Sequence, residues 1–89
     1  MSELEVQIVN RLGLHARAAA RLVHLANRFQ SKITVSKGGS KVDGKSILGL
    51  LTLAASKGSR LKLSAEGVDE TEAVAQLARL VRERFGEDA

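Results

Sequence analysis

The sequence contains no cysteine, and its only aromatic residues are Phe29 and Phe85. The absence of cysteine excludes disulfide bonds and thiolate metal sites. With so few aromatic side chains, the core must be built from leucine, valine, isoleucine and alanine, and binding of nucleic acid by base stacking is disfavoured. The net charge of +4 instead favours acidic partners or phosphate.

Long apolar runs and leader-like segments are also missing. No apolar run approaches the ~20 residues that span a bilayer, and no basic segment followed by a hydrophobic stretch opens the chain. We therefore expect a cytoplasmic protein without membrane contact. Its 89 residues should fold as one domain, residues 1–89, with a modest core and no deep substrate cavity. The two histidines have no pair of carboxylates near them, so we expect no metal ion and no cofactor.

Four segments alternate between polar and apolar residues, which is the period of a strand with one buried face. Between the second and third of them, Gly38-Gly39 predicts a tight hairpin. The predicted strands lie at residues 3–9, 32–36, 41–42 and 60–66, and their inward residues include Leu4, Val6, Ile8, Ile33, Val35, Leu61, Leu63 and Ala65.

Two helices are predicted in the first part of the chain. The first begins near His15 or Ala16, and its alanine content favours a helix. The second is short, over residues 47–53, and Ser46 stands in its N-cap position, while Lys57-Gly58 follows as a stop signal. The inward stripe of the first helix consists of Ala19, Leu22, Val23, Ala26 and Phe29.

A third helix is predicted after Asp69 and Glu72, whose spacing is that of a capping box. The order of elements is then β-α-β-β-α-β-α. Because a sheet with one apolar face needs its helices on that face, we predict an α/β open-faced two-layer sandwich. The inward stripe of the last helix consists of Val74, Leu77, Ala78, Val81 and Phe85.

An imidazole and a guanidinium stand where the first strand leads into the first helix, in the stretch Asn10-Arg11-Leu12-Gly13-Leu14-His15-Ala16-Arg17. The first amides of a helix have no partner inside it and carry the positive end of the helix dipole, so they attract anions. A phosphoryl group on His15 would meet these amides, including that of Ala16, and Arg17 would supply further donors. The positive end also disfavours the imidazolium and favours the neutral, nucleophilic ring. Taken alone, a histidine here is more often a cap or turn residue.

The segment Gly-Leu-His-Ala-Arg resembles the active-site motif of HPr, the phosphocarrier family of the bacterial phosphotransferase system. The resemblance extends to Lys45-Ser46-Ile47 before the short helix and to Lys57-Gly58 before the last strand, and covers nearly the whole chain. It implies a four-stranded antiparallel sheet with three helices on one face. It also implies that His15 receives a phosphoryl group from phosphoenolpyruvate through enzyme I and passes it to enzyme II components, including enzyme IIA, for sugar uptake, with Arg17 as phosphate partner. The chain would be a phosphoryl carrier and not a stand-alone enzyme.

The chain departs from the family pattern at one position, because Ala18 stands where the family usually has proline. Alanine fits the first turn of a helix and restores an amide, but it loses the fixed torsion of proline. We therefore expect the chemistry to persist in a less rigid site.

Two further roles follow from the resemblance. Ser46 is expected to cap the short helix and, in addition, to be phosphorylated by a regulatory serine kinase. Apolar residues beside His15 are expected to form a docking patch for partner proteins, in a chain that we expect to be monomeric. The predicted partner-binding residues are Ala20, Lys45, Ile47, Leu48 and Leu51.

Several alternatives stay open at this point. The nitrogen-related branch of phosphotransferase carriers shares the Gly-x-His-Ala-Arg pattern and delivers phosphate to regulatory partners. A pure interaction module would use His15 and Ser46 only as contact points. Binding of nucleic acid is supported by the basic charge and opposed by the lack of aromatics, so we expect none.

Overall fold

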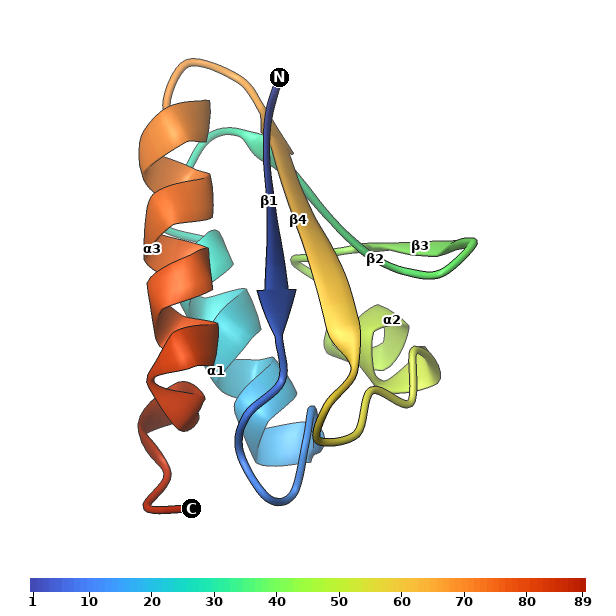
Figure 1. Ribbon diagram of the computed structural model, residues 1–89. Helices are drawn as coiled ribbons and strands as arrows, with labels where there is room; N and C mark the ends of the chain where they lie inside the picture. The colour runs from blue at the N-terminus through green and yellow to red at the C-terminus, as the bar shows by residue number, and fades with distance from the viewer.

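The protein is described by a computed structural model that covers residues 1–89. Four strands and three α-helices follow one another in the predicted order, and a single turn of 3-10 helix, η1, is added at the end (Figure 1). The elements are β1 (Ser2–Gln7), α1 (Ala16–Ala26), β2 (Lys32–Lys37), β3 (Ser40–Asp43), α2 (Ile47–Thr52), β4 (Arg60–Glu66), α3 (Glu70–Arg82) and η1 (Arg84–Gly86).

The strands form one antiparallel sheet in the order β1-β4-β2-β3. In its register, Val6 lies opposite Leu61 and Val35 lies opposite Leu63. Alternate residues therefore meet on the same face across the strands, as the period of two predicts. The expected four-stranded antiparallel sheet is confirmed.

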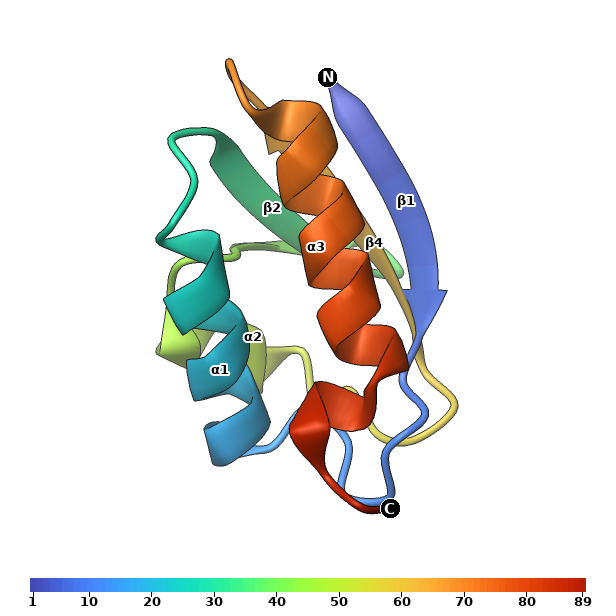
Figure 2. The same cartoon turned by 90° about the vertical axis from the view of Figure 1, so that its left-hand side faces the viewer.

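One face of this sheet is covered by helices and the other is left polar. Figure 2 views the covered side, where α1 and α3 lie across the strands. A cluster of 22 buried hydrophobic residues fills the space between the two layers, and it is almost entirely aliphatic. The open-faced two-layer sandwich is therefore confirmed, and each helix lies where it can bury its apolar stripe.

Some predicted boundaries were wrong. Helix α1 ends at Ala26, so Phe29 lies in the following turn, where it still packs against the core. Helix α2 ends at Thr52, one residue before its predicted end, which suits a short helix with glycine at position 49. Leu4 is on the inward side but 38% exposed, since β1 is an edge strand.

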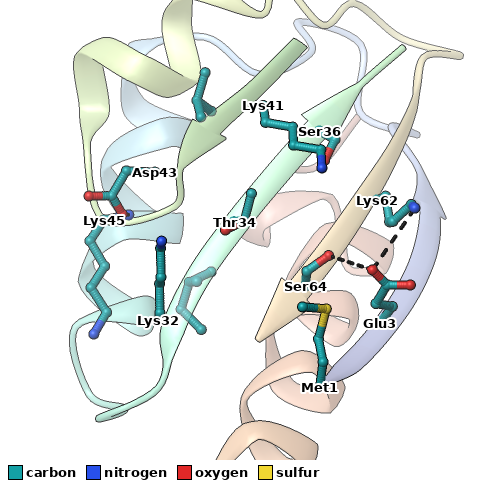
Figure 3. A pocket seen from close by; sticks show the side chains of 12 residues that line it. Met1, Glu3, Lys32, Thr34, Ser36, Lys41, Asp43, Lys45, Lys62 and Ser64 are labelled. Carbon is teal, nitrogen blue, oxygen red and sulfur yellow. Dashed lines mark hydrogen bonds and ion pairs between the residues drawn. The ribbon is translucent and has the colours of Figure 1, made fainter. Parts of the chain in front are cut away.

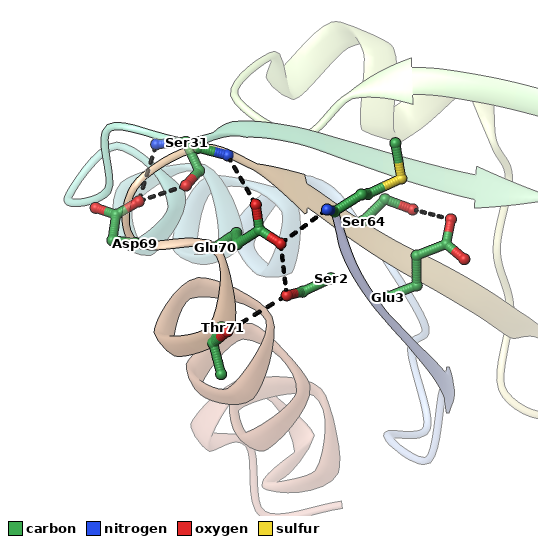
Figure 4. Close-up of polar contacts among 9 residues, drawn as sticks. Ser2, Glu3, Ser31, Ser64, Asp69, Glu70 and Thr71 are labelled. Atoms are coloured by element: carbon green, nitrogen blue, oxygen red, sulfur yellow. Dashed lines mark hydrogen bonds and ion pairs between the residues drawn. The ribbon is translucent and has the colours of Figure 1, made fainter.

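The predicted capping box at Asp69 was also wrong. The Asp69 side chain makes no bond to its own helix and accepts from the Gln30 amide at 2.9 Å and from the amide and hydroxyl of Ser31. These bonds, the Ser31 hydroxyl first, lower the pKa of Asp69. The reason is geometric: Asp69 has φ −111° and ψ 27°, which differs from the extended backbone of a usual N-cap. The carboxylate instead joins α3 to the turn before β2 (Figure 4).

Glu70, at the start of α3, holds the N-terminus of the chain. It accepts from the Met1 amino group at 3.0 Å, from the Ser2 hydroxyl at 2.9 Å and from the Gly67 amide at 3.2 Å (Figure 4). The bond from the amino group is the main reason why the pKa of Glu70 lies below its usual value. The first strand is thereby fixed to the helix layer.

Helix α3 ends earlier than the predicted apolar stripe, which runs to Phe85. Phe85 is buried as predicted, with 1% exposure, but the α-helix stops at Arg82. Arg84 and Phe85 both have left-handed backbone torsions, with φ of 59° and 54°. The chain therefore leaves the helix here, and its C-terminal tail, residues 86–89, lies beside the loop between β1 and α1 (Figure 2).

Candidate functional site

The loop between β1 and α1 is held in one conformation by glycine. Gly13 has φ +69°, and a Cβ at this position would lie 2.6 Å from the Ala55 carbonyl oxygen. The next amide, that of Leu14, donates to the same oxygen at 2.8 Å. A side chain at position 13 would break this contact, so glycine is required for the loop to deliver His15 to the helix.

His15 is the N-cap of α1, and its side chain is 26% exposed. Its backbone is extended, with φ −79° and ψ 179°, and its Nδ1 accepts from the Arg17 amide at 3.2 Å. The Ala16 and Ala18 amides make no hydrogen bond within the chain. One ring nitrogen therefore faces the positive end of the helix, beside two free donors.

The other ring nitrogen faces the C-terminal tail. His15 Nε2 pairs with Glu87 Oε2, and Glu87 Oε1 accepts from Asn10 Nδ2 at 2.9 Å. Asn10 Nδ2 also donates to the Gly13 carbonyl at 2.8 Å. The hydrogen bond from Asn10, followed by that from His15, lowers the pKa of Glu87. Glu87 is therefore a carboxylate at neutral pH.

These contacts determine where the imidazole carries its proton. A carboxylate only accepts, so Nε2 must carry the hydrogen that faces Glu87. Nδ1 accepts from the Arg17 amide, so it must present its lone pair. In this arrangement the proton lies on Nε2, and Nδ1 directs its lone pair toward the start of α1.

Three arginines surround a shallow hollow beside this ring. Arg11, Arg17 and Arg21 line it together with Leu12 and residues 86–89. Arg21 donates to the Phe85 carbonyl, whereas the Arg17 guanidinium has no hydrogen bond or ion pair. The guanidinium of Arg17 is therefore not engaged by another group of the chain.

Ser46 occupies the predicted N-cap position of α2. Its Oγ accepts from the Gly49 amide at 3.0 Å. Directly after it, Ile47 and Leu48 are exposed, with Leu48 at 78%. Leu51 packs partly against the core and Ala20 is half-buried on α1, the helix that packs against α2. The structure therefore places these apolar residues on two neighbouring helices.

Lys45 lies apart from the other predicted partner-binding residues. Its Nζ donates to the Phe29 carbonyl at 2.8 Å. It lines a hollow on the open face of the sheet, with Lys32 and Asp43 (Figure 3). None of the residues around His15 lines that hollow.

Sequence reasoning missed Glu87 altogether and gave Asn10 no role. Glu87 is 72 positions away from His15 in the chain. No periodic pattern links the two, because the tail that carries Glu87 lies beyond the last helix and has no regular structure. The only local signal was an acidic residue directly after Phe85-Gly86, where the apolar stripe ends.

The structure contains no group of three or more histidine, aspartate or glutamate side chains placed to hold a metal ion. None of its helices has the length and apolar character needed to cross a bilayer.

Comparison with known proteins identifies the family. Residues 2–83 match the family model described as the PTS HPr component phosphorylation site. The phosphocarrier protein HPr of Neisseria meningitidis is 45% identical over 87 residues, and that of Pseudomonas aeruginosa is 48% identical over 88 residues, each over 98% of both chains. The crystal structure of HPr from Thermoanaerobacter tengcongensis superposes with a TM-score of 0.96 at 47% identity, over the full length of both chains. The chain therefore belongs to the HPr family of phosphocarriers of the phosphotransferase system, which implies enzyme I and enzyme II components as its partners.

Proposed function

We propose that His15 is the residue that carries the phosphoryl group, receiving it from phosphoenolpyruvate through enzyme I and donating it to enzyme II components in the cytoplasm. One observation carries this proposal: Nδ1 of the neutral ring presents its lone pair at the start of α1, beside the unpaired amides of Ala16 and Ala18. These amides and the helix dipole stabilise the negative charge of a phosphoryl group on Nδ1.

In the transfer step, the Nδ1 lone pair forms a bond to phosphorus. The bond between phosphorus and the donor atom of enzyme I breaks, and its electron pair stays with the donor. Arg17 stabilises the oxygens of the transferring group, because its guanidinium is free and lines the hollow beside the ring. Transfer to an acceptor protein reverses these changes and returns the lone pair to Nδ1.

We also propose that residues 1–89 act as one carrier domain that docks through the apolar residues of α1 and α2. Leu48 in particular presents an aliphatic side chain that has no partner in the chain. Ala20, Ile47 and Leu51 extend the surface, and Lys45 adds positive charge on the side of the sheet. An acidic partner fits this surface because the chain has a net charge of +4.

Ser46 is proposed as a regulatory phosphorylation site for a serine kinase. A phosphate on Ser46 would sit at the start of α2, next to the exposed Ile47 and Leu48. Its negative charge would then oppose docking of an acidic partner.

The unprotonated Nδ1 at the start of α1 and the guanidinium of Arg17, which has no hydrogen bond or ion pair, favour phosphoryl transfer over a pure interaction module.

The test is incubation with labelled phosphoenolpyruvate and a bacterial enzyme I. We expect one acid-labile phosphoryl group on the protein, because protonation of a phosphoramidate improves its leaving group, whereas a serine ester is not labile in this way. His24 is a matched control, since it is an exposed histidine on the same helix. The His24→Ala protein should be labelled and the His15→Ala protein should not; equal labelling of the His15→Ala protein would refute the proposal.

A further inference from the structure

The C-terminal tail lies beyond residues 2–83, the part of the chain that matches the family model. Three contacts nevertheless fix it against the site. The buried Phe85 side chain anchors its start, Arg21 donates to the Phe85 carbonyl, and the Arg11 amide donates to the Ala89 carbonyl at 3.0 Å. Terminal segments are usually poorly ordered unless contacts hold them. These contacts therefore hold residues 86–89 in place beside the site.

At the centre of these contacts, the Glu87 side chain is only 14% exposed. Its two oxygens are both used, one by His15 and the other by Asn10. Asn10 is fully buried, and both groups that face its amide nitrogen are acceptors, so its orientation is fixed. Its Oδ1 is consequently buried without a hydrogen-bond partner.

We propose that Glu87 is a positioning residue for phosphoryl transfer, which Asn10 orients and which in turn holds the proton of His15 on Nε2. This inference rests on the proposed function of His15. The arrangement has the logic of a catalytic triad, in which a buried acid selects the tautomer of a histidine and stabilises its cationic form.

The chemical consequence concerns the charge of the ring. When Nδ1 forms its bond to phosphorus, the ring still carries the proton on Nε2 and becomes cationic. The carboxylate of Glu87 stabilises this charge directly. In the onward step the nitrogen–phosphorus bond breaks, its electron pair returns to Nδ1, and the ring leaves as a neutral imidazole with the Nε2 proton unchanged. Glu87 thus assists both acceptance and donation without itself taking up a proton.

Glu87→Gln is the decisive variant, because a carboxamide cannot reproduce both contacts. If its oxygen faces Asn10, its NH₂ group faces Nε2 and forces the proton of His15 onto Nδ1. If its oxygen faces His15, its NH₂ group opposes that of Asn10. Glu87→Asp keeps the charge on a shorter side chain and should restore part of the rate. Glu66→Gln is the matched control, since it makes the same change at an exposed side chain at the end of β4 that has no hydrogen bond or ion pair and lies outside the hollow beside His15.

Two measurements are needed for each variant. The first is the proton position on the His15 ring of the unphosphorylated protein, from ¹H–¹⁵N correlation spectra at about pH 8.5, where an imidazole is neutral. The second is the rate of phosphoryl transfer from phosphorylated enzyme I. For Glu87→Gln we expect a measurable population protonated on Nδ1 and a rate that is about 10- to 100-fold lower, as for other residues that orient a functional histidine. Glu66→Gln should match the parent in both, and thermal melts check that every variant is folded.

The proposal requires both changes in Glu87→Gln. A slower transfer with an unchanged ring, an altered ring with unchanged transfer, or a faster transfer would each overturn it, as would an equal loss of rate in Glu66→Gln. Failure of the proposed function is recognised separately: the parent protein would then accept no phosphoryl group, while the spectra would still report whether Glu87 sets the tautomer.

Discussion

Substitution of Ser46 separates its role as a helix cap from its proposed role in regulation. In the Ser46→Ala protein, the bond from the Gly49 amide at 3.0 Å is lost. In the Ser46→Asp protein, a carboxylate takes over this bond and adds a negative charge where the helix dipole favours it. We therefore expect Ser46→Ala to be the less stable variant and Ser46→Asp to be the one that binds its partner more weakly.

The magnitudes follow from the position of Ser46. Loss of an N-cap bond costs about 1 kcal/mol, which lowers the melting temperature of a chain of this size by about 4–8 °C. The aspartate variant should melt close to the parent. Its charge would lie beside the exposed Ile47 and Leu48, and at about 6 Å from an acidic group of a partner it would cost about 0.7 kcal/mol in water and about 3 kcal/mol at an effective dielectric constant of 20. Affinity for enzyme I should then fall by about 3- to 100-fold.

Thermal melts and titration calorimetry against enzyme I measure the two effects independently. Ser40→Asp is the control for charge, because Ser40 is exposed at the hairpin between β2 and β3. We expect Ser46→Ala to bind enzyme I as the parent does but to have a lower melting temperature. We expect Ser46→Asp to bind enzyme I more weakly and to have the melting temperature of the parent. If Ser46→Asp binds and melts like the parent, Ser46 is only a cap; if Ser40→Asp weakens binding equally, the effect is one of net charge.

Three other changes test the remaining structural claims. Arg17→Ala should slow transfer about 10²- to 10³-fold, because it removes a free donor to the transferring group, and its melting temperature should be unchanged. If rapid-quench kinetics of this variant match those of the parent, Arg17 has no role in transfer. Ala18→Pro removes an amide that has no partner, so the melting temperature should stay the same or rise by a few degrees, whereas a fall of more than about 5 °C would contradict that geometry. The lowered pKa of Asp69 means that its contribution to stability is complete above its unfolded pKa and is lost as the pH falls through the folded value. In denaturant unfolding, the free energy of unfolding should accordingly fall less steeply below about pH 4 in Asp69→Asn than in the parent protein. Equal slopes for the two proteins would refute this assignment.

The parts of the fold that sequence patterns predicted are those in which each element is amphipathic. Ile33, Val35, Leu61 and Leu63 alternate with polar residues, and all four are buried on the helix-covered face. The pairing order of the strands could not be obtained in this way, since a period of two says which face is buried and not which strand is the neighbour. The resemblance to a known family supplied that part, together with the expected role of His15.

Local patterns failed where a side chain found a better partner far away in the chain. Asp69 and Glu72 have the spacing of a capping box, yet Asp69 binds the amides of Gln30 and Ser31. An isolated helix would offer the carboxylate only its own first-turn amides. In the folded chain, the turn before β2 offers two amides and a hydroxyl that lack other partners, and three donors outweigh one.

The tail could not be predicted for a different reason, because it depends on strain that the core offsets. Arg84 and Phe85 are not glycine, and two left-handed residues in succession cost on the order of 1–3 kcal/mol each. Burial of the Phe85 ring contributes about 1.5–3 kcal/mol, and the bond from Arg21 to its carbonyl adds to this. Had α3 simply continued from Arg82, each residue would have advanced a further ~1.5 Å along the helix axis, and Glu87 would have been carried past the loop that presents His15. The residue that reads as the last position of an apolar stripe is therefore also the point at which the chain leaves the helical path and brings a carboxylate to the imidazole, and burial of its aromatic ring links the core to the site.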